Sequence, residues 1–176
     1  HALAQAAPYL RKPFPQGPSL QNPALALVLS GDAPLLTAPT LERLAAAAVR
    51  GWGAMAVAEL SEPGALGRVL ARDDGGLAAI VEARDASPAE LAIGTVNAGL
   101  YALPAPEILD FLERLRPDNA QGELYLTDAV TAAARAGRRV ELVRLEDPHE
   151  ALGVNDPAEL ARVDRLLAAR AAGRQD

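Results

Sequence analysis

The chain lacks cysteine, has almost no lysine and contains few aromatic residues, and each shortage excludes a class of function. Without cysteine, its 176 residues can form no disulfide, no zinc–thiolate site and no thiol nucleophile. The single lysine, Lys12, and the net charge of −6 argue against a general nucleic-acid or anionic-membrane surface, which needs clustered basic residues. We therefore expect neither nucleic acid nor a membrane as a partner.

Long hydrophobic runs are also missing. No apolar run approaches the roughly 20 residues that span a bilayer, and no signal-peptide pattern is visible, so the cytoplasm is the expected compartment. Half of the residues are hydrophobic, mainly alanine and leucine. A chain of this length can form one domain with a real core, or a large part of a bigger domain.

The hydrophobic pattern alternates between strands and helices. Continuous apolar runs predict strands buried on both faces, a turn of the type Asp-Asp-Gly-Gly predicts a hairpin, and Ser-Pro-Ala-Glu and Asp-Pro-Ala-Glu predict helix starts. This alternation predicts an α/β domain with a mixed, mostly parallel sheet. The strands are expected at 24–29, 54–60, 96–103 and 139–145, the hairpin at 67–85 with its turn at 73–76, and helices at 39–50, 105–115, 124–136 and from 156 onward.

The stretch "LALVLSGDAPLLT" carries an apolar strand directly into a carboxylate, Asp32. In open α/β sheets, ligands lie beyond the carboxyl ends of the strands. Gly31 would let a ligand approach the backbone, and a carboxylate at that place suits Mg²⁺, which takes one or two protein oxygens and completes its shell with water and phosphate. A plain turn explains the same residues, because Gly-Asp-Ala-Pro is good turn chemistry. The residues alone leave both interpretations open.

Four motifs carry a family resemblance. They are "SGDAPLLTAPTLERL", "LGRVLARDDGGLAAIVEARDASPAELAIGTVNAGLYAL", "DNAQGELYLTDAV" and "ALGVNDPAELARVD". In this order and at this spacing they resemble the bacterial N-acetylglucosamine-1-phosphate uridyltransferases. The third motif is the most specific, and the resemblance extends over essentially the whole chain from Leu25 to Asp164.

The resemblance implies a Rossmann-like nucleotidyltransferase fold of the GT-A-like kind. Residues 1–156 would form the C-terminal two thirds of the nucleotidyltransferase domain, and residues 157–176 a C-terminal helix and tail. It also implies a Mg²⁺-dependent reaction in which UTP and N-acetylglucosamine 1-phosphate give UDP-N-acetylglucosamine and pyrophosphate. That product is a precursor of the peptidoglycan cell wall. The reaction needs no protein nucleophile, which agrees with the lack of cysteine.

The resemblance also assigns roles to residues. Asp32 and Asn155 match the catalytic pair that holds Mg²⁺, and Asn155 also borders the substrate. The remaining matches are to the substrate site: Gly31 near the nucleoside, Gly67, Glu82 and Asn97 on the amino sugar, and Tyr125 and Thr127 around its acetyl group. Taken singly, each residue has a structural explanation as a turn, a bulge or packing.

Several features depart from the family. The family begins with a strand and a glycine-rich loop that holds the nucleotide phosphates, and nothing in this sequence matches them. Ser30 and Leu66 stand where the family usually has tyrosine. No hexapeptide period of a left-handed β-helix acyltransferase domain is present, so a monomer is expected. Two alternatives therefore remain beside the uridyltransferase: a sugar-1-phosphate nucleotidyltransferase of other specificity, and a catalytically incompetent partial domain.

Overall fold

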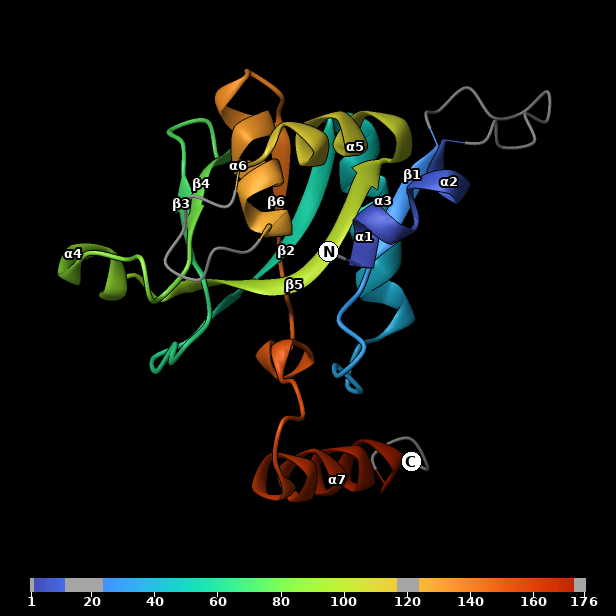
Figure 1. The fold of residues 1–176 in the computed structure, drawn as a ribbon. Helices are drawn as coiled ribbons and strands as arrows, with labels where there is room; N and C mark the ends of the chain where they lie inside the picture. Colours follow the sequence, from blue (N-terminus) through green and yellow to red (C-terminus); the bar gives the residue numbers. More distant parts are fainter. Residues whose placement is uncertain (1, 12–23, 117–123, 173–176) are drawn as a thin grey trace.

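A six-stranded sheet with helices on both faces forms the centre of the molecule (Figure 1). We describe the protein from a computed structural model, in residues 2–11, 24–116 and 124–172. The strand order is β4-β3-β5-β2-β6, and β1 pairs with β5 outside this path. The strands are β1 (Leu25–Val28), β2 (Gly53–Glu59), β3 (Arg68–Ala71), β4 (Leu77–Val81), β5 (Thr95–Pro104) and β6 (Val140–Arg144).

The α/β class and the mixed sheet predicted from the sequence are confirmed, but the expected predominance of parallel pairs is wrong. Among the described strands, β2 and β6 form the one parallel pair. The long strand β5 runs antiparallel to β1, β2 and β3, and β4 runs antiparallel to β3. A continuous apolar run indicates that both faces of a strand are buried. It does not determine whether the neighbouring strands run parallel or antiparallel to it.

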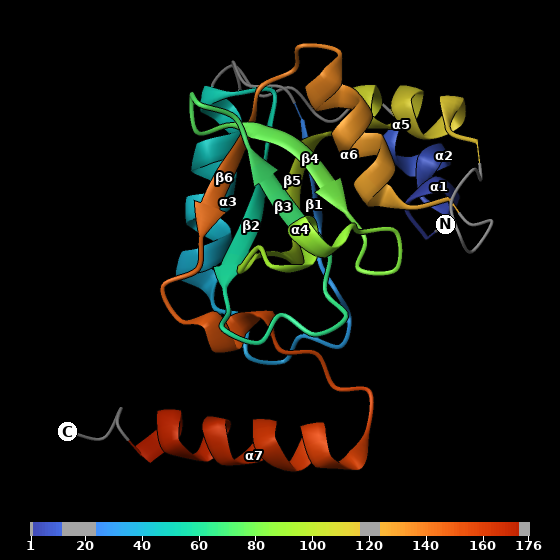
Figure 2. The same ribbon diagram turned by 90° about the vertical axis from the view of Figure 1, so that its left-hand side faces the viewer.

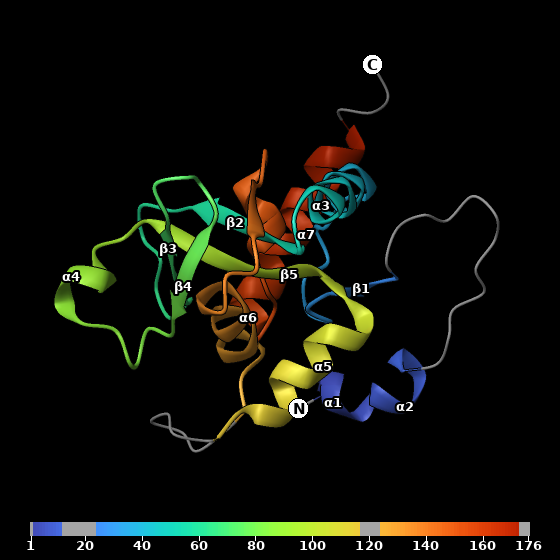
Figure 3. The same cartoon turned by 90° about the horizontal axis from the view of Figure 1, so that it is seen from above.

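Helices cover the two faces of the sheet unequally (Figures 2 and 3). Helix α3 (Ala38–Arg50) covers one face, and α5 (Ala105–Arg114) and α6 (Leu126–Arg135) cover the other. Strand β2 is buried on both faces, as predicted: its alanines at 54, 56 and 58 face the α3 side, whereas Met55 and Val57 face the α5 and α6 side. The small alanine side chains let α3 pack close to the sheet.

The edge strand β1 differs from its prediction. Its continuous apolar run indicates burial on both faces, yet the side chain of Leu27 is 46% exposed. Within the described residues β1 pairs with β5 alone, so its other edge has no strand partner. The short helices α1 (Ala2–Gln5) and α2 (Ala7–Leu10) pack instead on the core beside α5. Burial on both faces needs a neighbour that the hydrophobic run cannot specify.

Local sequence signals place the smaller elements correctly. The hairpin of β3 and β4 forms with its turn at 73–76, and Ser87 and Glu90 form the predicted capping box of α4 (Pro88–Leu91). Both features depend on residues adjacent in sequence, so tertiary contacts have little chance to override them.

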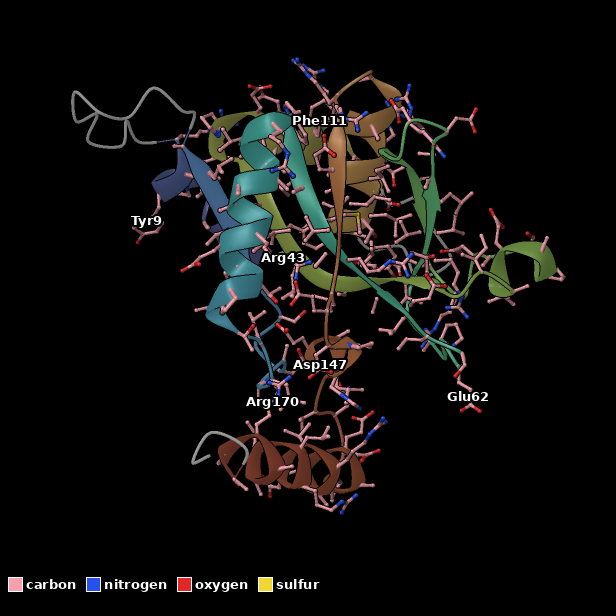
Figure 4. All side chains as sticks on the ribbon, turned by 180° about the vertical axis from the view of Figure 1, so that it is seen from behind. Tyr9, Arg43, Glu62, Phe111, Asp147 and Arg170 are labelled. Carbon is pink, nitrogen blue, oxygen red and sulfur yellow. The ribbon has the colours of Figure 1, made fainter. Side chains whose placement is uncertain are left out.

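The last helix, α7 (Pro157–Ala172), follows the short helix η1 (Pro148–Ala151) and lies below the sheet in Figure 1. Arg170 of α7 reaches Asp147, just before η1, with a nitrogen–oxygen distance of 2.5 Å (Figure 4), and donates a second hydrogen bond to the carbonyl of Leu35. No helix among the described residues has the length and apolar character to cross a membrane.

Candidate functional site

The candidate site is a cavity of about 240 Å³ at one edge of the sheet. It lies where β1, β2 and β6 end and where the β3–β4 pair meets the start of β5, at the lower side of the sheet in Figure 1. Five residues predicted from the sequence line it, together with both departures from the family pattern. The predicted ones are Asp32, Gly67, Glu82, Asn97 and Asn155, and the departures are Ser30 and Leu66.

Two side chains converge above Gly153. A Cβ atom at Gly153 would lie 2.8 Å from Asp32 Oδ2 and 3.5 Å from the Asn155 side-chain nitrogen. The loop after β1 and the loop after η1 are also joined directly, because Val154 donates its backbone N–H to the Asp32 carbonyl at 3.0 Å. Residues more than 120 positions apart therefore present one carboxylate and one amide to the same point.

The start of α7 holds Asn155 in place. Asp156 accepts the backbone N–H groups of Ala158 and Glu159, both at 2.8 Å, which is the capping predicted from the sequence. Glu159 in turn accepts the backbone N–H of Asn155 at 2.6 Å. These bonds fix the backbone on both sides of Asn155, whose side chain lines the cavity.

A second part of the cavity is built around Glu82, directly after β4. Thr127, which is buried in α6, donates its hydroxyl to Glu82 Oε1 at 2.8 Å. The other carboxylate oxygen lies 3.3 Å from the place where a Cβ at Gly67 would be. One oxygen of Glu82 is thus held by the protein, and the other faces a gap that glycine keeps open.

Asn97 is held from behind by its own strand. Its side-chain oxygen accepts the N–H of Gly99 at 3.0 Å, and its backbone N–H bonds to the Gly67 carbonyl at 2.9 Å. Burial raises the pKa of Tyr101 well above its ordinary value; a hydrogen bond with Asn97 opposes this and the Glu82 charge adds to it. The side-chain oxygen of Asn97 therefore already accepts one hydrogen bond within the protein.

Gly99 is required by its backbone. It has φ +72°, which favours glycine, and a Cβ there would lie 2.6 Å from the Ser30 hydroxyl. This residue bends β5 beside a register shift in the pairing with β2. Gly99, Asn97 and Ser30 all line the cavity, and no local sequence pattern marked Gly99 as a site residue.

Some predicted residues lie elsewhere. Tyr125 lines an adjoining hollow of about 280 Å³ together with Glu82, and Thr127 lies behind Glu82. Gly31 is exposed and does not line the cavities described here. Residues 117–123, which hold most of the "DNAQGELYLTD" motif, lie outside the described residues.

The charges that line the main cavity are both negative, on Asp32 and Glu82. A basic side chain, Arg162 of α7, lines a second adjoining hollow of about 270 Å³ that shares Gly153 and Asn155 with the main cavity. Arg162 is not among the residues predicted from the sequence. Arg162 follows Glu159 by three residues in one helix. This spacing could have predicted that both side chains lie on the same side of α7.

The donor set fits one small divalent cation. Sugar nucleotidyltransferases generally use a divalent metal, and no group of three or more histidine, aspartate or glutamate side chains that could hold a metal occurs in the described part of the chain. A carboxylate and the oxygen of a neighbouring side-chain amide are what a hard cation needs when phosphate oxygens and water supply its other ligands.

The fold is similar to that of solved sugar nucleotidyltransferases. An apo UDP-glucose pyrophosphorylase matches with a TM-score of 0.60 and 16% identity over 82% of this chain and 50% of that one. A nucleoside-diphosphate-sugar pyrophosphorylase from Vibrio cholerae matches with a TM-score of 0.54 and 15% identity over 78% of this chain and 55% of that one. At this identity the similarity shows the fold alone.

Similarity in sequence is much closer. No protein-family model matches the chain. The bifunctional protein GlmU of Pelotomaculum thermopropionicum is 43% identical over 173 residues, 97% of this chain, and that of Syntrophotalea carbinolica is 47% identical over 146 residues, 82% of this chain. The chain spans about a third of the length of these relatives, 36% and 31%. Over that third, the chain belongs to the GlmU family, as its sequence motifs indicate.

Proposed function

We propose that this chain forms the sugar-phosphate side of an active site that transfers a uridylyl group. The substrates are N-acetylglucosamine 1-phosphate and UTP, and the products are UDP-N-acetylglucosamine and pyrophosphate. The observation that carries the proposal is the gathering of Asp32, Gly67, Glu82, Asn97 and Asn155 around one cavity. These residues come from five separate segments, so a set of unrelated turns and bulges has no reason to converge.

The cavity supplies groups of the kinds that a sugar needs. Glu82 has one oxygen free to accept a sugar hydroxyl, since Thr127 holds the other. Asn97 accepts the Gly99 N–H and also shares a hydrogen bond with Tyr101, so the second N–H of its NH₂ group is the part left to donate to the sugar. Gly67 leaves room for the ring to approach. Tyr125, in the adjoining hollow, would border the acetyl group.

The reaction proceeds by displacement at phosphorus. An oxygen of the sugar phosphate attacks the α-phosphorus of UTP, a phosphorus–oxygen bond forms, and the bond to the β-phosphate breaks, so pyrophosphate leaves with the electron pair. Such reactions depend on positioning and charge neutralisation rather than on a protein nucleophile. Arg162 adds positive charge beside the cavity, where anionic substrates must approach the carboxylates of Asp32 and Glu82.

We assign Asp32 and Asn155 to a Mg²⁺ ion. When bound, the ion neutralises charge on the reacting phosphates. A neutral amide beside a single carboxylate keeps the site from becoming too negative for phosphate ligands. Gly153 leaves the space above it free for the Asp32 carboxylate.

A related enzyme with another sugar is the second candidate. Ser30 and Leu66, which replace tyrosines usual in the family, both line the cavity. Each replacement removes ring surface against which a sugar can pack, so the pocket is wider than the family pattern implies. A panel of sugar 1-phosphates with UTP and dTTP separates the two candidates by their kcat/KM values.

The test measures pyrophosphate release by the longest natural protein that contains this sequence, with UTP and N-acetylglucosamine 1-phosphate. Glu82→Ala and Asn97→Ala should each raise the KM for the sugar phosphate or lower kcat, because a lost hydrogen bond to a buried hydroxyl costs about 1–3 kcal/mol. Glu62→Ala is the control, since Glu62 projects away from the molecule (Figure 4). Unchanged kinetics in both variants would contradict the sugar assignment. If the parent protein transferred a uridylyl group to no sugar phosphate, the alternative of a catalytically incompetent partial domain would remain.

A further inference from the structure

A buried carboxylate connects the two loops that carry Asp32 and Asn155. Glu150, in η1, is only 3% exposed. Its Oε2 accepts the backbone N–H of Thr37 at 3.0 Å and lies 3.2 Å from the Thr37 hydroxyl, and its Oε1 accepts the hydroxyl of Thr40 at 3.0 Å. These partners are all neutral and all lie at the start of α3.

Capping of α3 does not by itself require this carboxylate. Thr37 occupies the N-cap position but makes no side-chain capping bond, and Glu150 takes its place from more than 100 residues away. A local serine or aspartate could satisfy the same N–H group. Burying a charge is costly even near a helix N-terminus, whose dipole favours it. What Glu150 adds over a local cap is a link between distant segments.

This link lies next to the proposed metal ligands on both sides. Gly153 and Asn155 follow Glu150 within one short loop, and Asp32 precedes Thr37 in another. The bond from Val154 N–H to the Asp32 carbonyl joins the two loops at one point. Arg170 adds a further tether, between the carbonyl of Leu35 and the carboxylate of Asp147. Glu150 differs from both contacts because it anchors its segment to the start of the helix α3, which restrains the orientation of the loops.

We propose that Glu150 is a positioning residue that sets the spacing between the Asp32 carboxylate and the Asn155 amide, and so the affinity for the divalent cation. The proposal rests on the metal site of the proposed function. Glu150 itself does not line the cavity described above. It acts through the two loops, as residues behind metal ligands commonly do.

The experiment measures Mn²⁺ binding directly, from the electron paramagnetic resonance signal of free Mn²⁺, in the longest natural protein that contains this sequence. Glu150→Gln keeps the shape of the side chain but turns one acceptor into a donor against the Thr37 N–H or a threonine hydroxyl. We expect its Kd for Mn²⁺ to rise about 10-fold, and the Mg²⁺ concentration for half-maximal activity to rise in parallel. The KM for the sugar phosphate should stay within about twofold.

The matched control is Glu90→Gln. Glu90 also accepts a backbone N–H at a helix start, from Ser87 at 2.8 Å, but in α4, away from the cavity. We expect it to leave Mn²⁺ binding unchanged. Should Glu150→Gln fail to fold, Thr40→Val removes one of the hydrogen bonds, whereas Thr40→Ser keeps the hydroxyl. Mn²⁺ binding should weaken in the valine variant and not in the serine variant.

A purely structural role predicts a different result: a lower melting temperature with the same Kd for Mn²⁺ at a temperature where the protein is folded. That result, or a parent protein that binds no Mn²⁺, would overturn the proposal. The proposed function can fail separately. A protein that binds Mn²⁺ through this link but transfers no uridylyl group would keep the positioning role and refute the reaction.

Discussion

Replacing Gly153 with alanine tests the site with a single methyl group. A Cβ there would lie 2.8 Å from Asp32 Oδ2, closer than real contacts allow. The crowded atom is the end of a short side chain, not backbone, so the carboxylate can retreat. Gly153 has no positive φ, so alanine fits its backbone. The change therefore separates the geometry of the site from the stability of the fold.

The structure gives the size of the effect. Ordinary contact begins at 3.4 Å, so the carboxylate must withdraw by about 0.6 Å. Functional groups must be held within about 0.5 Å of their productive geometry, and a misplacement of about 1 Å can cost about 100-fold in rate. We expect kcat/KM to fall about 10-fold, which corresponds to about 1.4 kcal/mol. Stability should be unchanged or rise by about 0.4–1 kcal/mol, because alanine restricts the unfolded chain.

The assay is the initial rate of pyrophosphate release against Mg²⁺ concentration, with thermal unfolding as the folding control. Gly76→Ala is the matched variant, since a Cβ there would lie 3.2 Å from Asp74 Oδ1. It also crowds an aspartate, but in the turn of the β3–β4 hairpin, away from the cavity. Its rate and Mg²⁺ dependence should match those of the parent.

Two results would refute this reasoning. If Gly153→Ala kept the rate and Mg²⁺ dependence of the parent, the convergence of Asp32 and Asn155 would have no role in the reaction. If the variant lost activity together with several degrees of melting temperature, the methyl group would be disturbing the fold, and the carboxylate could not have retreated as cheaply as we infer.

Three further predictions use other residues. Asp32→Asn should keep the fold and lose most Mg²⁺-dependent activity. The loss of kcat/KM in the double variant with Asn155→Ala should be far smaller than the sum of the two single losses. If Asp32 were only a turn residue, Asp32→Asn would leave kcat/KM nearly unchanged. Thr127→Val should raise the KM for the sugar phosphate about 5-fold, because Glu82 loses a bond worth about 1 kcal/mol; an unchanged KM would show that this bond does not orient Glu82. Partial burial opposes the shift, but hydrogen bonds from Arg170 and His149 lower the pKa of Asp147 below its ordinary 3.8. A carboxyl group whose pKa is lowered by folding stabilises the folded state at pH values above its ordinary pKa. The difference in unfolding free energy between the parent and Asp147→Asn should therefore be present at pH 6 and shrink as the pH falls below 3.8. Denaturant titration at each pH measures this difference.

The sequence alone determined the local elements and named five of the residues that line the candidate cavity. The capping box at Ser87, the hairpin turn at 73–76 and the helix start at Asp156 form where predicted, because each depends on a few neighbouring residues. The family motifs identified residues such as Asp32, Glu82 and Asn97, which the structure brings to one cavity. A family motif identifies residues of one site because it shows which residue types occur together in the family. It does not show how those residues are arranged in space.

Only the tertiary structure decided how the strands pair and what holds the site residues. The direction of β5, the exposed side of β1 and the bend at Gly99 depend on neighbours far along the chain. The same holds for Glu150. In the sequence it follows a proline and a histidine, and nothing distinguishes it from a solvent-exposed glutamate. Its burial and its bonds to Thr37 and Thr40 appear only when the chain folds, because hydrophobic periodicity reports which side of an element is covered and not which distant group covers it.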